Sequence, residues 1–263
     1  MKAWKRIHIT KKRAVCGVLG LLLLAAAYMG VPRAAEKVFA VAEGERRLPI
    51  YCVQTEKPQV SVSFDAAWGA DDTDELLRIL KENDVKATFF LCGYWVEKYP
   101  EEVKKIAAEG HDLGNHSATH PHMSRISSEE IAQELQKCHE NVKKLTGVEM
   151  ELFRPPFGEY DNHVIETAEQ NGYYTIQWDV DSLDWKEQGA EAEIRQVLEH
   201  KHLGNGSIIL FHNDAKYTPK VLDTILKGIK EKGFEIVPIS QLIHRENFEM
   251  DHEGRQILKG KEA

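Results

Sequence analysis

The sequence predicts an α/β fold, a distorted (β/α)7-8 barrel preceded by an N-terminal membrane-targeting segment. Strand-like and helix-like segments alternate along residues 57–245, a pattern typical of a parallel sheet built from βαβ units. Polar residues follow several of the apolar runs, at the carboxyl ends of strands, where β/α barrels hold their chemistry. The chain of 263 residues is long enough to bury one large core.

Short connections separate the predicted segments, and about seven β/α units suit a closed or nearly closed barrel. In chain order we expect strand 59–65, helix 73–84, strand 87–92, helix 100–109, strand 111–115, helix 128–146, strand 151–154, helix 161–171, strand 173–179, helix 190–201, strand 207–212, helix 216–232 and strand 234–238.

The helix over 128–146 illustrates the local causes. Ser127 stands three residues before Glu130, which is the spacing of a capping box, and Gly147 provides a stop signal. Its apolar residues fall four, three, four and three positions apart and therefore share one face. They are Ile131, Leu135, Cys138, Val142 and Leu145.

The N-terminus has the pattern of a membrane-targeting segment. Residues 1–13 contain six basic residues and no acid, and residues 14–31 contain no charge. Eighteen uncharged residues are close to the minimum for a membrane span and exceed the usual apolar stretch of a signal peptide. We therefore expect a retained anchor with a cytoplasmic N-terminus and an extracytoplasmic catalytic domain, the alternative being secretion after cleavage near the Ala-Val-Ala of residues 40–42.

Four regions follow from this organisation. We expect a basic segment with a signal anchor or signal peptide over 1–35, a stalk over 36–56, a catalytic domain over 57–245 and a charged tail over 246–263.

The charge of the chain argues against nucleic acid as a partner. Residues 1–42 hold eight of the 34 Lys and Arg residues and one of the 42 Asp and Glu residues, so residues 43–263 carry 26 basic and 41 acidic groups, a net charge of −15. Such a surface repels phosphate backbones.

The cysteines do not have the spacing of a metal site. We interpret Cys52, Cys92 and Cys138 as small buried residues, and whether two of them form a disulfide stays open.

His116 and His120 are the strongest local signal, because two imidazoles four residues apart meet on one face of a helical turn and form a common metal-binding pair. Other polar residues at the ends of predicted strands are expected to lie near them. These are Asp65, Arg154, Asp181 or Asp184, and His212.

Five motifs in this order resemble the polysaccharide deacetylase family with its NodB-homology domain, carbohydrate esterase family 4. The resemblance covers about residues 57–245. The motifs are Ser63 to Asp65, His116 to His120, Arg154 to Phe157, Asp181 to Trp185, and Ile208 to His212.

The resemblance implies hydrolysis of an acetamide with the help of one divalent metal ion, zinc or alternatively cobalt or nickel. By similarity, His116 and His120 hold the metal, which acidifies a water molecule and polarises the carbonyl group. Asp65 would be the general base and His212 the general acid.

Further residues would support these groups. Arg154 would keep Asp65 ionised, and Asp184 would orient His212 and keep it protonated, although Asp181 remains open for that role. An aromatic wall could pack against the sugar ring, formed by Phe157, Tyr160 and Trp185.

One position departs from the family pattern. The family has two consecutive acids in the first motif, base and then metal ligand, but Asp65 is followed by Ala66. Asp71 or Asp72 could supply the missing carboxylate, although both precede a predicted helix and are also candidates for its cap. Otherwise water completes a two-histidine site, or no metal binds. A similar substitution occurs in the sporulation-associated peptidoglycan deacetylase branch of the family, which the N-terminal anchor and the short domain also resemble.

The expected function is therefore metal-dependent removal of acetyl groups from cell-wall glycan such as peptidoglycan, on N-acetylglucosamine or N-acetylmuramic acid units, by a monomer. The alternative is a glycan-binding pseudoenzyme at the membrane surface.

Overall fold

The computed structural model describes residues 46–260. The expected membrane-targeting segment and the first part of the stalk lie outside these residues. The chain divides at Arg46, and the unit Arg47–Ala263 is the one described below. Within residues 46–260, no helix is both long and apolar enough to cross a membrane.

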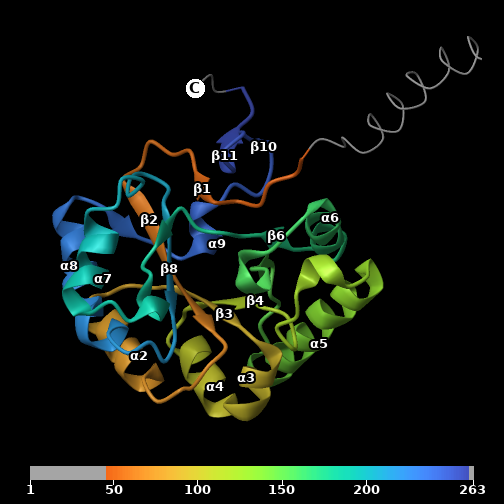
Figure 1. Cartoon of the computed structure of the whole chain (residues 1–263), viewed down its shortest axis with the longest axis horizontal. Helices are drawn as coiled ribbons and strands as arrows, with labels where there is room; N and C mark the ends of the chain where they lie inside the picture. Colours follow the sequence, from red (N-terminus) through yellow and green to blue (C-terminus); the bar gives the residue numbers. More distant parts are fainter. Residues whose placement is uncertain (1–45, 261–263) are drawn as a thin grey trace, which may run out of the picture. The chain divides into compact units, whose positions relative to one another are not determined.

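A parallel sheet forms the centre of the domain (Figure 1). Its strands follow the order β6-β5-β4-β3-β2-β8-β7, and β9 pairs with the first residues of β2. They are β2 (Gln59–Ala66), β3 (Thr88–Leu91), β4 (Asp112–Asn115), β5 (Leu152–Phe153), β6 (Tyr174–Thr175), β7 (Val180–Asp181), β8 (Ile208–His212) and β9 (Glu235–Ile236).

The sheet is a curled half-barrel, so the expected barrel closure is only partly correct. Of the predicted strand 173–179, only β6 forms, and β7 begins just beyond the predicted range. The two strands pair with β5 and β8 at opposite ends of the sheet. Among residues 46–260, no pairing joins β6 to β7. The chain from Ile50 occupies the outer edge of β6 instead: its amide donates to the carbonyl of Thr175, and its carbonyl accepts from Gln177.

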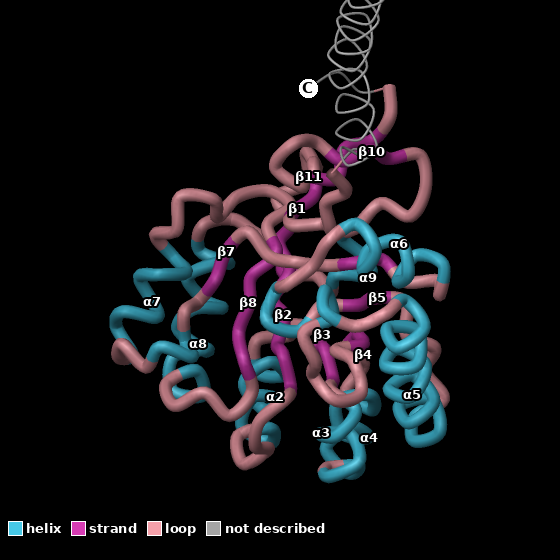
Figure 2. Tube along the Cα trace, turned by 45° about the vertical axis from the view of Figure 1, so that its right-hand side comes forward, coloured by secondary structure: helices cyan, strands magenta, loops and turns pink. Residues whose placement is uncertain are grey.

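Most helices pack around the outside of the curled sheet (Figures 1 and 2), whereas the short helix Ile239–Leu242 packs with Phe90 against its other face. They are α2 (Thr73–Glu82), α3 (Gly93–Lys98), α4 (Pro100–Ala108), α5 (Ser128–Thr146), α6 (Asn162–Gln170), α7 (Ala190–Leu198), α8 (Thr218–Glu231) and α9 (Ile239–Leu242). Three short 3-10 helices are η1 (Met123–Arg125), η2 (Pro156–Gly158) and η3 (Asp184–Lys186). Helix α3 was not predicted, because six residues beginning with Gly93 carry little periodic signal.

The capping box of α5 is confirmed. The Ser127 hydroxyl accepts from the Glu130 amide at 3.2 Å, and the Glu130 carboxylate accepts from the Ser127 amide at 2.9 Å. Gly147 ends the helix in the left-handed conformation, with φ of 75°.

Both faces of the sheet are buried, as expected for parallel strands. Phe64 and Phe89 stack 4.9 Å apart in the core that includes helices α2 to α8, whereas Phe90 belongs to a second cluster with Leu152, Ile208 and helix α9. The expected burial of the cysteines is also confirmed: Cys52, Cys92 and Cys138 are buried and free.

The region 246–260 is part of the folded domain rather than a tail. β10 (Phe248–Met250) and β11 (Arg255–Leu258) form a hairpin, and β11 pairs with β1 (Cys52–Val53) in a separate three-stranded sheet. The Asp251 carboxylate accepts from the amides of Glu253 and Arg255 in the connecting turn. The folded domain therefore begins before residue 57, inside the expected stalk, and extends beyond residue 245.

Candidate active site

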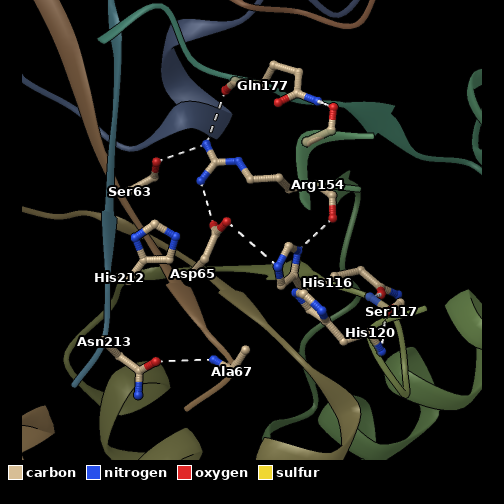
Figure 3. A network of polar contacts seen from close by, with 12 residues as sticks. Ser63, Asp65, Ala67, His116, Ser117, His120, Arg154, Gln177, His212 and Asn213 are labelled. Carbon is tan, nitrogen blue, oxygen red and sulfur yellow. Dashed lines mark hydrogen bonds and ion pairs between the residues drawn. The ribbon is translucent and has the colours of Figure 1, made fainter. Parts of the chain in front are cut away.

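Polar side chains from several strands converge at the carboxyl end of the sheet (Figure 3). Asp65 of β2 lies directly opposite His212 of the neighbouring strand β8. His116 follows β4, and Arg154 follows β5. The sequence therefore placed these four residues correctly, because parallel strands end at the same edge.

A buried ion pair joins Asp65 to Arg154. Nη1 of Arg154 lies 2.7 Å from Oδ1 of Asp65, while Nη2 donates to the Ser63 hydroxyl at 2.9 Å and the Gln177 carbonyl at 3.1 Å. The guanidinium lies 4.0 Å from the centre of the Phe90 ring and is fully buried. Burial alone would raise the pKa of Asp65. The positive charge of Arg154, together with the nearby His116 and His212, has the larger effect and lowers the pKa of this carboxyl. Asp65 is therefore ionised at neutral pH.

His116 and His120 are neutral and close together. Nδ1 of His116 lies 2.7 Å from the carbonyl oxygen of Arg154, so this nitrogen carries the proton and Nε2 keeps its lone pair. Nε2 lies 3.7 Å from Oδ2 of Asp65, and the two imidazole centres are 4.9 Å apart. Burial lowers the pKa of His116, and burial and His116 lower that of His120 to about 4. Both rings therefore have the charge state of a metal ligand.

A loop, not a helical turn, brings the two histidines together. Ser117 and His120 have positive φ values of 65° and 57°. The Glu134 carboxylate fixes this loop by accepting from the amides of Ala118 and Thr119 and from the Thr119 hydroxyl. The spacing thus predicted the proximity correctly and its backbone geometry wrongly.

The suggested third ligands do not join the pair. Oδ2 of Asp72 accepts from the Asp214 amide at 2.7 Å, and Asp71 is exposed. Asp72 is the N-cap residue of α2, yet its side chain makes no capping hydrogen bond. In the part of the chain that the structure describes, no three His, Cys, Asp or Glu side chains are arranged to hold a metal ion. Ala66 is fully buried in the apolar core.

Unlike His116 and His120, His212 is held in the protonated state. Its Nδ1 lies 2.7 Å from Oδ1 of Asp184, and its amide donates to Oδ2 at 2.6 Å. Asp184 is thus the partner, whereas the Asp181 carboxylate accepts from the Leu183 amide at 2.8 Å. Burial would lower the pKa of His212, but Asp184 outweighs it, followed by Asp65 and Asp181, and the pKa is raised. The ring is therefore an imidazolium near neutral pH, with its Nε2 proton free to be donated.

Aromatic side chains surround a cavity of about 340 Å³ above these groups. Phe157 and Trp185 line it as expected, with exposed fractions of 56% and 49%. Tyr160 does not line the cavity; its hydroxyl pairs with that of Tyr51 at 3.0 Å. Tyr51 lies in the expected stalk, so no motif pointed to this contact.

Two aromatic residues of the cavity were not predicted as site residues, Trp68 and Trp178. Trp68 stacks on His212 with ring centres 5.1 Å apart and an angle of 11°. The next residue, Gly69, approaches Asp214 so closely that an added Cβ would lie 2.2 Å from Oδ2. The sequence feature that could have identified Trp68 is the Trp-Gly pair just after the predicted strand 59–65.

Several known proteins are similar to this chain in sequence and in fold. A family profile described as polysaccharide deacetylase matches residues 53–176. The uncharacterized protein YlxY of Bacillus subtilis is 36% identical over 195 residues, which make up 74% of this chain but only 60% of that protein. A peptidoglycan-N-acetylglucosamine deacetylase of Bacillus cereus is 34% identical, with 71% of this chain and 68% of that protein covered.

A solved structure provides a further comparison. BA3943 of Bacillus anthracis, described as a CE4 family pseudoenzyme, matches with a TM-score of 0.70 and 36% identity, over 74% of this chain and 68% of that chain. A mutant of BA3943 is described as having restored enzymatic activity.

The first prediction concerns the packing beneath Arg154. A Cβ added at Gly114 would lie 2.5 Å from the Phe90 ring, which supports the guanidinium. Gly114→Ala should lower the free energy of unfolding by about 1–3 kcal/mol, as overpacking generally does, measured by denaturant unfolding. Gly204→Ala is the control, since its nearest neighbour would be 3.7 Å away. Equal stability of the two variants would contradict the packing argument.

The second prediction concerns the charge of His212. In the parent, the stabilisation from the Asp184 pair is complete below the ordinary histidine pKa of 6.5 and is lost as the pH rises through the raised folded-state value. Asp184→Asn removes the carboxylate and leaves the burial, so the His212 pKa should fall by about one pH unit or more, as followed by NMR. An unchanged titration would show that Asp184 does not set the charge.

Proposed function

Because the chain belongs to the polysaccharide deacetylase family, carbohydrate esterase family 4, we propose that it hydrolyses the acetamide group of N-acetylated sugars in cell-wall glycan, releasing acetate and a free amine. The observation that carries this proposal is the pairing of opposite charge states in one cavity. Asp65 is held as a carboxylate and His212 as an imidazolium, at opposed positions of neighbouring strands. Hydrolysis requires both, one to accept a proton and one to donate it.

His116 and His120 suit a divalent cation, zinc being the expected ion. The hydrogen bond from His116 to the Arg154 carbonyl leaves Nε2 as the ligand atom, and both imidazoles are neutral. The carboxylate that would complete the site is lacking at Ala66, so we propose weaker binding than at a three-ligand site. When bound, the cation would lower the pKa of a water molecule and polarise the acetamide carbonyl.

The protein groups would then divide the proton transfers. Asp65 accepts the proton of the attacking water as the new C–O bond forms. Its lowered pKa makes it a weak base, so catalysis depends on prior acidification of the water. His212 donates its Nε2 proton to the amine nitrogen as the C–N bond breaks, and Asp184 stabilises the imidazolium until that transfer.

The aromatic residues support a sugar substrate. Trp68, Phe157 and Trp185 present large apolar faces at the cavity and are about half exposed, at 48%, 56% and 49%. Pyranose rings have apolar faces that pack against such rings. The names of the relatives support peptidoglycan as the glycan.

A second candidate function is glycan binding without hydrolysis. Two observations favour it: the ligand position holds Ala66, and residues 46–260 contain no three-ligand cluster. The similarity to the BA3943 pseudoenzyme points the same way. This candidate shares the aromatic cavity and differs only in chemistry.

We further propose that the domain acts outside the cytoplasm, attached to the membrane as a monomer. The membrane attachment is supported by the sequence of residues 1–31, in which a basic segment precedes an uncharged one. Secretion after cleavage is the alternative.

The third prediction tests the proposed acid and base. With zinc supplied, Asp65→Asn and His212→Ala should each reduce acetate release from an N-acetylglucosamine oligosaccharide by roughly 10²-fold or more, because each removes one proton transfer. The exposed His252 offers a control, His252→Ala, which should keep full activity. If either Asp65→Asn or His212→Ala released acetate at the parental rate, the assigned roles would be refuted. If the parent protein released no acetate but still bound the oligosaccharide, the second function would be favoured.

The fourth prediction concerns the missing ligand. The Ala66 side chain is fully buried, so the carboxylate of Ala66→Asp would lack solvent and should lower the melting temperature in the absence of metal. Zinc should restore the melting temperature and bind about tenfold more tightly than to the parent.

Ala67→Asp is the matched control for this experiment. Ala67 lines the cavity and is only partly buried, so its carboxylate can remain hydrated. Its metal-free stability should stay near the parental value. Zinc affinity unchanged by Ala66→Asp in a calorimetric titration would contradict the assignment of position 66.

A further inference from the structure

A second buried carboxyl group lies behind the pair of His212 and Asp184. Glu193 of α7 is 5% exposed, and Thr218, at the start of α8, is fully buried. The Thr218 hydroxyl lies 2.8 Å from Oε1 of Glu193 and 3.2 Å from Oδ2 of Asp184. One hydroxyl group therefore connects the two carboxyl groups.

The hydrogen bonds of Asp184 require this residue to be ionised. Its Oδ1 accepts from the Trp185 amide at 2.7 Å and faces Nδ1 of His212, while its Oδ2 accepts from the His212 amide. With Thr218, four donors surround the two oxygens, which matches the accepting capacity of a carboxylate. A proton on Asp184 would displace one of these donors.

The Thr218 hydroxyl has a single proton and faces two acids. If it donates to Asp184, its oxygen can only accept from Glu193, and Glu193 must then bring a proton of its own. If Glu193 were ionised, two negative oxygens would compete for one hydrogen, and one buried acceptor would face a lone pair.

We propose that Glu193 carries a proton and donates it in a hydrogen bond to Thr218, whose hydroxyl donates to Asp184, so that Glu193 is a positioning residue for the catalytic acid His212. Glu193 does not line the cavity and acts through Asp184. Its importance for catalysis rests on the proposed function, whereas its protonation does not.

The surroundings of Glu193 agree with a protonated carboxyl. Burial raises its pKa to about 7, the hydrogen bond with Thr218 opposes the rise, and the charge of Asp184 adds to it. Asp181 of β7 is occupied with the Leu183 amide, and Arg195 on the same helix pairs with exposed Glu191 at 3.8 Å.

In this arrangement Asp184 is the one charged member of the chain Asp184–Thr218–Glu193. Asp184 keeps His212 protonated. The hydrogen bond that Thr218 donates to Asp184 weakens this stabilisation, so the imidazolium can release its proton more easily. An acid that must release its proton at each turnover benefits from both effects.

NMR titration of His212 in the full-length protein, without metal or substrate, tests the proposal. Glu193→Gln keeps a neutral side chain that can donate to Thr218, so the pKa of His212 should stay within about 0.3 of the parental value. Removal of an ionised Glu193 would instead lower the His212 pKa by about half a pH unit or more, and that result would overturn the proposal. Glu191→Gln, on the exposed face of α7, should leave it unchanged.

Thr218→Val breaks the connection without changing the size of the side chain. Asp184 then loses a donor and holds more charge, so the pKa of His212 should rise by about half a pH unit. An unchanged value would show that the hydroxyl does not act on Asp184.

Infrared difference spectra provide a readout that needs neither histidine assignment nor activity. The parent minus Glu193→Gln spectrum at pH 6 should contain the carbonyl stretch of a protonated carboxylic acid. A carboxylate band in its place would overturn the proposal, whatever the outcome for acetate release.

Discussion

The buried ion pair of Asp65 and Arg154 is the interaction on which the site depends. An unpaired carboxylate at this depth would take up a proton, and an unpaired guanidinium would be a large desolvation cost. Arg154 also fixes its neighbours, because its guanidinium lies on the Phe90 ring and its carbonyl sets the tautomer of His116. One residue thus controls the ionisation of the proposed base and the free lone pair of a proposed metal ligand.

Histidine takes two charge states in this site because the surroundings differ. His116 is buried and His120 is half-buried, each beside a guanidinium or another imidazole, which favours neutral rings. His212 is half-buried as well, but the carboxylate of Asp184 reverses the effect of burial. Neutral rings suit a cation and a charged ring suits proton donation, so the pattern of partners separates the two roles.

The sequence predicted what depends on local periodicity and on the ends of strands. The convergence of Asp65, His116 and His212 follows from strand order in a parallel sheet, and the helix cap at Ser127 follows from a four-residue motif. The interactions that were missed join distant segments, such as the hydrogen bond of Asp72 to Asp214. Asp72 and Asp214 are 142 residues apart in the sequence, and a contact over that distance has no periodic signature. The hairpin of β10 and β11 was missed because its strands are short and charged.

Whether two histidines suffice to hold a cation decides between hydrolysis and glycan binding alone. The geometry around His116 and His120 supports binding, and Ala66 weakens it. The most direct measurement is a calorimetric titration of zinc into the metal-free full-length protein at neutral pH. The account predicts one zinc ion per chain, lost in His116→Ala and retained in His252→Ala. Absence of saturable zinc binding in the parent would contradict metal-dependent hydrolysis.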